Sequence, residues 1–430
     1  MTQLLLRNGS FGDVAPSVVA PAIATSGRSR QAGDVTGIEW SLVTTIEAFE
    51  ALEDDWNALH RAVGHKSHAF QSFNWCWHWC RHYLGDGRTR PSLAIVTGRI
   101  GARLALVMPL VTQRKSGLME LTWLGEPVSQ YGDLLAAPAA AAIEHLEAAW
   151  RFAVTQSRAD VANLRRVRDD AIAARLFDHL AAEVTTAEEA PFLELSADRC
   201  FKGWENRRKP RAIKNRRRQE RRLAEQGEIR FVALTGSEEA AALAAHAVRL
   251  KRDTLADKGD ISLTLADPRF ERFFADVVHG CGRPAGATVL ALTSQGTPAA
   301  LKILIETKDA AFLHVAVFEP RFEKCGVGAL LLEHAIGRTI TDGRREFDLL
   351  PPRHNYKLDF ADGSVFVRDY AVALSAKGWV YTRGVLKLRS RIKRAITKMP
   401  KSVRRVIGRL ASSSVASRSG TAATNHHSAA

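Results

Sequence analysis

The sequence predicts a mixed α/β (α+β) protein with two globular lobes. Segments with strand and helix patterns alternate along the chain, and the order strand, proline, helix, strand occurs twice, around Pro138 and around Pro320. The chain has 430 residues, of which 46% are hydrophobic, and this is more than one ordinary core accommodates. We therefore expect two lobes of one architecture, at residues 38–190 and 191–382.

The first lobe is expected to open with a strand and a helix. Residues 38–43 have a strand pattern, and residues 46–63 carry apolar side chains at helical spacing. An aromatic helix capped by Ser72 follows. Further strands are expected at 92–97, 102–112, 121–124, 131–135 and 161–167, and further helices at 139–156 and 171–182.

The aromatic helix contains two pairs of potential metal ligands. His78 and His82 lie four residues apart, as do Cys76 and Cys80. The two pairs fall on nearly opposite faces of a helix, and the sequence offers no third ligand. We therefore interpret this segment as an aromatic core helix and expect no metal.

The second lobe is expected to contain a hairpin, two long helices and a basic helix. Strands are predicted at 192–195, 229–234, 288–293, 299–306, 312–318 and 346–350, and helices at 238–258, from Pro268 onward and at 329–341. A basic helix at 205–226 is expected because residues 212–226 are good helix formers and Gly227 can end it. This helix fits nucleic-acid binding, docking on an acidic partner, or a solvated surface.

The positive charge is concentrated in two segments. The net charge is +15. Lys202–Arg222 holds eleven Lys and Arg against Glu205 and Glu220, and Arg383–Arg409 holds eleven with no acidic residue. The remainder therefore carries about −5, so the body of the protein lacks the composition of a domain with a whole basic face.

The cysteines and the ends of the chain indicate a cytoplasmic protein. The five cysteines include no CxxC pair, which argues against a disulfide framework or a zinc knuckle. No segment reaches the roughly 18 apolar residues of a spanning helix. We expect residues 1–37 and 411–430 to be disordered. Residues 383–410 are expected to form a basic amphipathic segment that docks on a membrane surface or a partner.

A glycine-containing loop between a strand and a helix is the strongest candidate for a binding site. In the segment 312–350, the loop Cys325-Gly326-Val327-Gly328 follows a predicted strand and precedes a predicted helix. Backbone N–H groups at a helix N-terminus attract anions such as a pyrophosphate. The first lobe has no equivalent loop.

The chain resembles a known family in this region. The segment VAVFEPRFEKCGVGALLLEHAI is similar to the acyl-CoA-binding loop of the GNAT N-acyltransferases, and GRREFDLLPPRHNYKLDF resembles a segment of the CelD-like acetyltransferases of bacterial polysaccharide gene clusters. FQSFNWCWHW and RLKRDTLADKGDISLTLADPRFERFF also match. FemAB-type transferases are related in architecture. The resemblance implies two GNAT-like mixed-sheet lobes in tandem, the first without a glycine loop.

The resemblance also implies a reaction and a set of residues. The reaction is transfer of an acyl (acetyl) group from acyl-CoA to an amine or hydroxyl, in exopolysaccharide or cell-envelope synthesis. Tyr356 is the expected general acid, and Asp348 or His354 the base. Residues expected to bind acyl-CoA are Val315, Val317, Arg321, Lys324, Cys325, Gly326, Val327, Gly328 and Ala329. Those expected to contact the acceptor, a small molecule or a glycan or lipid precursor, are Lys357 and His314.

One departure from the family pattern concerns Glu323. The family has Gln or Arg three residues before the first glycine, where this chain has an acidic residue. Arg321 and Lys324 are expected to supply compensating charge to a bound pyrophosphate.

Two alternatives remain open at this point. The first is a FemAB-like aminoacyl transferase that uses charged tRNA and contacts it through Lys202–Arg222. The second is a non-catalytic GNAT scaffold that docks on a membrane-associated synthase through residues 384–410. In either case the expected location is the cytoplasm, or the inner face of the membrane.

Overall fold

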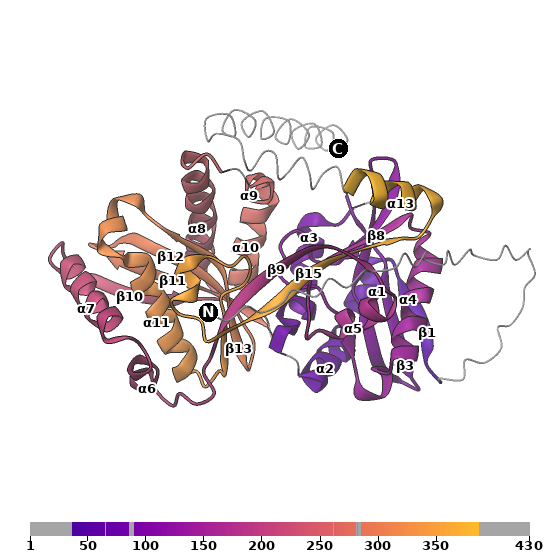
Figure 1. Ribbon diagram of the computed structural model, residues 1–430, viewed down its shortest axis with the longest axis horizontal. Helices are drawn as coiled ribbons and strands as arrows, with labels where there is room; N and C mark the ends of the chain where they lie inside the picture. The colour runs from indigo at the N-terminus through magenta and orange to yellow at the C-terminus, as the bar shows by residue number, and fades with distance from the viewer. Residues whose placement is uncertain are drawn as a thin grey trace, which may run out of the picture. The chain divides into compact units, whose positions relative to one another are not determined.

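One mixed sheet runs through both halves of the protein. The computed structural model describes residues 37–64, 66–85, 90–260, 262–280, 282 and 285–386. Its larger sheet has eleven strands in the order β10-β11-β12-β13-β14-β9-β15-β8-β6-β5-β2. β9 (Glu183–Glu194) and β15 (Gly363–Ala373) pair with each other in the middle of this order and run between the two groups of elements in Figure 1. The expected lobe boundary at residue 190 falls inside β9.

The first half adds a smaller sheet and five α-helices among the described residues. The four-stranded sheet has the order β1 (Glu39–Val43), β3 (Ile95–Ile100), β4 (Arg103–Met108), β7 (Leu135–Ala136). Its contributions to the large sheet are β2 (Ser92–Leu93), β5 (Leu110–Lys115), β6 (Leu118–Trp123) and β8 (Val161–Arg168). The helices are α1 (Ile46–Glu50), α2 (Glu53–Val63), α3 (Phe73–Tyr83), α4 (Ile143–Ser157) and α5 (Ile172–His179).

The second half places helices on both faces of its strands. The strands are β10 (Ile229–Leu234), β11 (Gly286–Ser294), β12 (Thr297–Glu306), β13 (Ala310–Phe318) and β14 (Glu346–Asp348). The helices are α6 (Phe201–Asn206), α7 (Pro210–Ala224), α8 (Glu238–Asp257), α9 (Leu263–Ala266), α10 (Pro268–Gly280), α11 (Val327–Thr341) and α12 (Asn355–Leu358). The last helix, α13 (Ala376–Val380), follows β15 and lies beside β8 of the first half (Figure 1).

Local sequence accounts for several helix starts. The hydroxyl groups of Ser72 and Ser237 accept hydrogen bonds from N–H groups in the first turns of α3 and α8. Asp267 accepts the N–H of Arg269 at the start of α10, as its position before Pro268 predicts.

An aromatic core joins the two halves. Trp75 of α3 packs edge-on against Phe273 of α10, with the ring centroids 4.8 Å apart, and both side chains are buried. The aromatic core helix expected after Ser72 is therefore confirmed. His82 at its end bonds to Asp276 of α10 at 2.8 Å.

Four expectations about the elements are wrong. The helix expected at 46–63 is interrupted between α1 and α2. The strand expected at 102–112 is divided at Pro109, which lacks an N–H, so that β4 and β5 belong to different sheets. Where a strand was expected at 131–135, only the two-residue strand β7 forms, at Leu135–Ala136. The basic helix begins at Pro210 rather than at residue 205, because Pro210 occupies its first turn.

The expected repeat of strand, helix and strand is present in both halves. In the first half, its first strand is β6 and not the strand expected at 131–135. β6 and β8 are parallel neighbours with α4 between them in the chain, as β13 and β14 are with α11 between them. The strand before Pro138 that matches β13 is thus β6.

Other expectations lie outside the described residues. These concern the leader at 1–36 and the segments 387–410 and 411–430. In the part of the chain that the structure describes, no helix has the length and apolar character needed to cross a membrane.

We predict that stability falls as the pH drops from about 6.5 to 4. Burial lowers the pKa values of His60, His78 and His314 from 6.5 to about 4, so in this window the unfolded chain binds more protons than the folded protein. Each histidine should cost about 3 kcal/mol by pH 4. Urea unfolding at several pH values measures the loss. Replacing His60 by Gln should flatten the profile, and an unchanged profile would contradict the explanation.

Candidate active site

Two parallel strands separate in the middle of the second half. β13 pairs with β14 only at Ala310 to Phe312, opposite Glu346 to Asp348. Beyond these pairs β13 continues to Phe318, whereas the chain after β14 turns away through Leu350, which has a left-handed φ of 59°. We call the opening between the two diverging segments the fork.

The backbone N–H and carbonyl of Ala316 in β13 face the fork. The N–H of Glu319 bonds to the carbonyl of Ala299 in β12. Backbone direction alternates along a strand, so Val317 also faces β12, and Ala316 faces the fork. The Ala316 carbonyl accepts a hydrogen bond from Lys251 Nζ of α8 at 2.9 Å. The structure therefore places the accessible edge at Ala316 and directs the expected backbone contacts, Val315 and Val317, toward β12.

A β-bulge lies directly before this edge. In the β12–β13 register, Leu304 pairs with Leu313 and Ile303 with Val315, which leaves His314 without an opposite residue. His314 Nε2 donates to the carbonyl of Val128 in the first half at 2.7 Å. Because burial also lowers its pKa to about 4, His314 is a neutral side chain that links the two halves.

Three lysines gather around the fork. Lys357 Nζ donates to the carbonyls of Leu350 at 2.6 Å and Pro352 at 3.0 Å. Lys302 of β12 is 3% exposed, and no partner for its amine is found among the described residues. Burial lowers the pKa of Lys302 to about 7 and that of Lys357 to about 8, and the charge of Lys251 lowers both further. A large fraction of the Lys302 amine is therefore neutral near pH 7.

Asp348 is held in a buried cluster at the end of β14. Its carboxylate accepts the hydroxyl of Tyr131 at 2.8 Å, Nη1 of Arg168 at 2.9 Å and the N–H of Leu350 at 2.7 Å. Asp348 is 0% exposed, and Arg168 and Tyr131 are each 1% exposed. We call these three residues the Asp348 cluster. Asp348 therefore pairs with Arg168, whereas the amine of Lys357 bonds to backbone carbonyls.

His354 and Tyr356 lie on the exposed side of the fork. The ring of His354, which precedes α12, stacks on that of Tyr356 in α12 with centroids 6.1 Å apart, and Tyr356 is 47% exposed. Burial, Lys357 and Lys251 lower the pKa of His354, which favours the neutral imidazole at pH 7. Partial burial raises the pKa of Tyr356, so its hydroxyl stays protonated.

The glycine loop lies under the basic helix. Gly326 has φ 64° and caps α11, while Gly328 belongs to the first turn of the helix and not to the loop. A Cβ atom at Gly326 would lie 2.3 Å from the side-chain amide of Gln219 in α7, so this amide covers the loop. Cys325 is buried, and Gln226 contacts its sulfur at 3.4 Å. Arg321, Lys324 and Ala329 are exposed.

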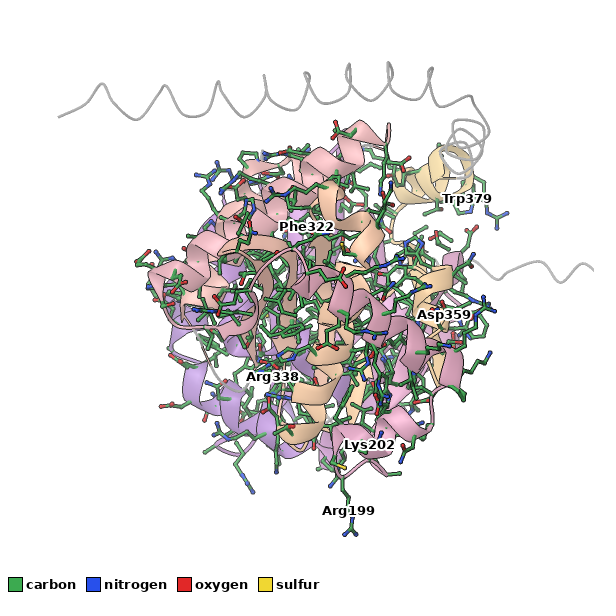
Figure 2. The ribbon with its side chains drawn as sticks, turned by 90° about the vertical axis from the view of Figure 1, so that its left-hand side faces the viewer. Arg199, Lys202, Phe322, Arg338, Asp359 and Trp379 are labelled. Carbon is green, nitrogen blue, oxygen red and sulfur yellow. The ribbon has the colours of Figure 1, made fainter. Side chains whose placement is uncertain are left out.

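A cleft of about 610 Å³ opens beside this loop, between α7, α11 and the segment after α12. We call it the basic cleft. Its charged lining residues are Arg207, Arg208, Lys209, Arg211, Arg216, Glu333, Asp359 and Asp362. Arg207 pairs with Asp198 and Asp362, but Lys209 and Arg211 are exposed and have no ion pair among the described residues. These two cations are available to an anionic ligand. Figure 2 shows Asp359 on the face of the molecule that carries the cleft.

No metal site is found among the described residues, since no group of three or more His, Cys, Asp or Glu is placed to hold an ion.

Sequence reasoning missed several residues of this site. Lys251, Ala316, Tyr131 and Arg168 lack a local signal, because their roles depend on contacts with distant segments. Lys302 had such a signal, since it is the single charged residue in the apolar run AALKILI of residues 299–305.

The comparisons with known proteins agree with this architecture. Residues 210–358 match the family model of an acetyltransferase (GNAT) domain. No curated protein sequence matches the chain. The solved structure titled "Crystal structure of FemX" is 9% identical and has a TM-score of 0.54, over 80% of this chain and 99% of that chain. A tandem GNAT protein from the clavulanic acid biosynthesis pathway is 12% identical, with a TM-score of 0.44, over 79% of this chain and 99% of that chain.

The similarity to FemX confirms the predicted mixed α/β fold class. The similarity to FemX extends over both halves, and the GNAT-type region includes the glycine loop and the fork. The chain therefore has a mixed α/β fold, and residues 210–358 of its second half are similar to a GNAT acetyltransferase domain.

We predict that Arg168→Met lowers the free energy of unfolding by about 3–5 kcal/mol, because it leaves the carboxylate of Asp348 buried without its cation. Arg353→Met is the control, since the Arg353–Glu189 pair is exposed and should be worth less than about 1 kcal/mol. Denaturant unfolding measures both. Equal losses would show that the Asp348 cluster contributes no more than a surface ion pair.

Proposed function

We propose that this protein transfers an acyl group from acyl-CoA to an amine or hydroxyl acceptor. The observation that carries the proposal is the backbone N–H of Ala316, which the strand register directs toward the fork, together with the cation-lined cleft at the N-terminal end of α11. The fork can receive an extended thiol arm by strand-like pairing, and the cleft can receive its phosphorylated end. The match to a GNAT acetyltransferase domain over 210–358 supports this assignment.

The basic cleft fits the nucleotide part of CoA. Its volume of about 610 Å³ is within the usual range of ligand pockets. Lys209 and Arg211 would contact the 3′-phosphate, because they are the exposed lining cations without ion pairs among the described residues. The N–H groups of Val327 and Gly328 would hold the pyrophosphate at the start of α11.

Gln219 compensates for the acidic residue at position 323. Its amide lies against Gly326, where it can donate a hydrogen bond to a phosphate oxygen. Glu323 is exposed and therefore costs little beside a bound anion in water. A side chain from α7 thus supplies the amide that the family pattern places in the loop itself.

The chemistry at the fork is a direct transfer. The nucleophile of the acceptor attacks the thioester carbonyl, whose developing negative charge is stabilised by the N–H of Ala316. The carbon–sulfur bond breaks, and the thiolate takes a proton from Tyr356. His354, neutral at pH 7, removes the proton of the acceptor. Asp348 has its carboxylate fully engaged, so it positions β14 and does not act as the base.

The acceptor belongs to exopolysaccharide or cell-envelope synthesis in this proposal, with acetyl as the acyl group. The support is the resemblance of residues 343–360 to CelD-like acetyltransferases. His314 and Lys357 lie beside the fork, and both donate hydrogen bonds to backbone carbonyls. In this proposal they form part of the wall against which the acceptor binds. The expected location is the cytoplasm.

A second candidate function rests on the solvent face of α7. Lys214, Arg217, Arg221 and Arg222 are exposed and have no ion pair among the described residues. Such a row of cations fits the phosphates of a charged tRNA, the donor of an aminoacyl transfer. In that case tRNA binding would weaken steeply with salt, whereas acetyl-CoA would not raise the melting temperature.

We predict that the double variant Lys209→Glu/Arg211→Glu binds acetyl-CoA at least about tenfold more weakly, because two cations beside the 3′-phosphate become anions. Binding of acetyl-dephospho-CoA should change by less than about threefold. Isothermal titration calorimetry measures both affinities. Arg151→Glu, an exposed change on α4, is the control. Equal losses for the two ligands would refute the placement of the 3′-phosphate.

We predict that Tyr356→Phe lowers kcat by about a hundredfold or more and leaves KM for acetyl-CoA nearly unchanged, because it removes only a proton donor. Release of the CoA thiol with a panel of amino-sugar acceptors measures the rate. Asn355→Ala, in the same short helix, should retain full activity. A Tyr356→Phe enzyme as active as the original would rule out this general acid.

A further inference from the structure

The three lysines around the fork lack a balancing negative charge. Lys302 is 3% exposed and Lys357 5% exposed, and Lys251 is half-buried. In the described part of the chain, Lys251 and Lys357 donate to backbone carbonyls, and none of the three amines forms an ion pair with a carboxylate. Burying amines in this way costs hydration free energy, which a bound anion would offset.

The two arms of the fork each hold one of these amines. Lys251 Nζ bonds to the Ala316 carbonyl on β13 at 2.9 Å, and Lys357 Nζ bonds to the Leu350 carbonyl, after β14, at 2.6 Å. Lys302 lies opposite Ala316 in the β12–β13 register, so both side chains are on one face of the sheet. Ala316 has only a methyl group to separate Lys302 from the fork. The charge of Lys251 acts on the pKa values of both other lysines, as expected of amines around one opening.

Neighbouring charged groups do not supply the missing anion. Asp348 and Glu188 raise the pKa of Lys357 without forming an ion pair with it. The carboxylate of Asp348 is engaged by Arg168, and Glu188 is exposed to solvent, which screens its charge. His354 contributes no negative charge in either protonation state. The fork therefore has an excess of positive charge whenever its amines are protonated.

The anion does not come from acyl-CoA in the function proposed above, on which this inference rests. The phosphates of CoA lie in the basic cleft there, and the pantetheine arm and thioester that enter the fork carry no charge. The thiolate forms only as the carbon–sulfur bond breaks, and it then takes a proton from Tyr356. A negatively charged group bound at the fork therefore belongs to the acceptor.

We propose that the acceptor carries an anionic oxygen group, a phosphate or a carboxylate, and that Lys251, Lys302 and Lys357 bind this group beside the fork. Each protonated amine has three N–H donors, of which Lys251 uses one and Lys357 two. Both can therefore contact the anion without losing their bonds to the backbone. The charge-assisted bonds select an acidic precursor over its uncharged counterpart and hold it next to the thioester.

Isothermal titration calorimetry of the full-length protein with three amino sugars tests the proposal. Glucosamine is the parent compound, glucosamine 6-phosphate adds a phosphate, and muramic acid adds a carboxylate. At least one of the two acidic sugars should bind on the order of tenfold more tightly than glucosamine, and the tighter one identifies the anion. Equal binding of all three sugars would overturn the proposal.

The variant Lys302→Met separates this site from the basic cleft. It should bind the tighter acidic sugar about tenfold more weakly and should change glucosamine binding by less than about twofold. Its melting temperature should be unchanged or higher, because methionine removes a buried amine without a partner among the described residues. Lys308→Met, exposed on the same hairpin, and Lys209→Glu/Arg211→Glu, in the basic cleft, should not alter binding of the acidic sugar. Equal losses for both sugars in Lys302→Met would assign Lys302 a structural role and refute the anion site.

The pH dependence of binding gives a second readout. Burial and the charge of Lys251 lower the pKa of Lys302 to about 7, and the anion binds its protonated form. As the pH rises from about 6.5 to about 8.5, the affinity of the original protein for the acidic sugar should fall and approach that of Lys302→Met. Titration of the sugar itself affects both proteins alike. A constant difference in affinity between the two proteins over this range would contradict the role of Lys302.

Titration of acetyl-CoA into the same protein distinguishes a failure of this inference from a failure of the proposed function. If acetyl-CoA binds and the acidic sugars bind no more tightly than glucosamine, the anion site alone is refuted. If acetyl-CoA does not bind but an acidic sugar binds through Lys302, the anion site is supported and acyl transfer from CoA is refuted.

Discussion

The hydrogen bonding of Asp348 is the interaction on which the candidate site depends. Asp348 ends β14 at the point where this strand leaves β13, and its buried carboxylate is held by Tyr131 and Arg168 from the first half of the chain. The same carboxylate binds the N–H of Leu350 and so fixes the turn that opens the fork. The first half therefore has a structural function in the site although it lacks a glycine loop of its own.

Charged side chains are buried around the fork. Burial of a charge costs hydration free energy, and such burial is typical of functional sites. Lys302 and Lys357 lose hydration and have lowered pKa values, and Lys302 has no partner among the described residues to offset that loss. The bulge at His314 turns the backbone of Ala316 toward the same opening. Such a concentration of unfavourable local features is consistent with selection for binding and catalysis rather than for stability.

The sequence predicted those features that depend on neighbouring residues. The strand, glycine loop, helix and strand at 312–350 follow from local pattern, and so does the cap of α10 by Asp267. Register and distant contacts could not be predicted. The bulge at His314 decides that Ala316, rather than Val315 or Val317, faces the fork, and no sequence pattern reveals it. Gln219 is more than a hundred residues from Gly326, so its position over the loop required the fold.

The central claim is that acyl-CoA lies along Ala316 and over the start of α11. Hydrogen–deuterium exchange of the full-length protein, with and without acetyl-CoA, tests it most directly. Exchange should slow in peptides that cover residues 313–330 and 207–219, and should stay unchanged in α4 and α5 of the first half. If acetyl-CoA bound and the peptides at 313–330 exchanged at the same rate as in its absence, the fork would not be the binding site.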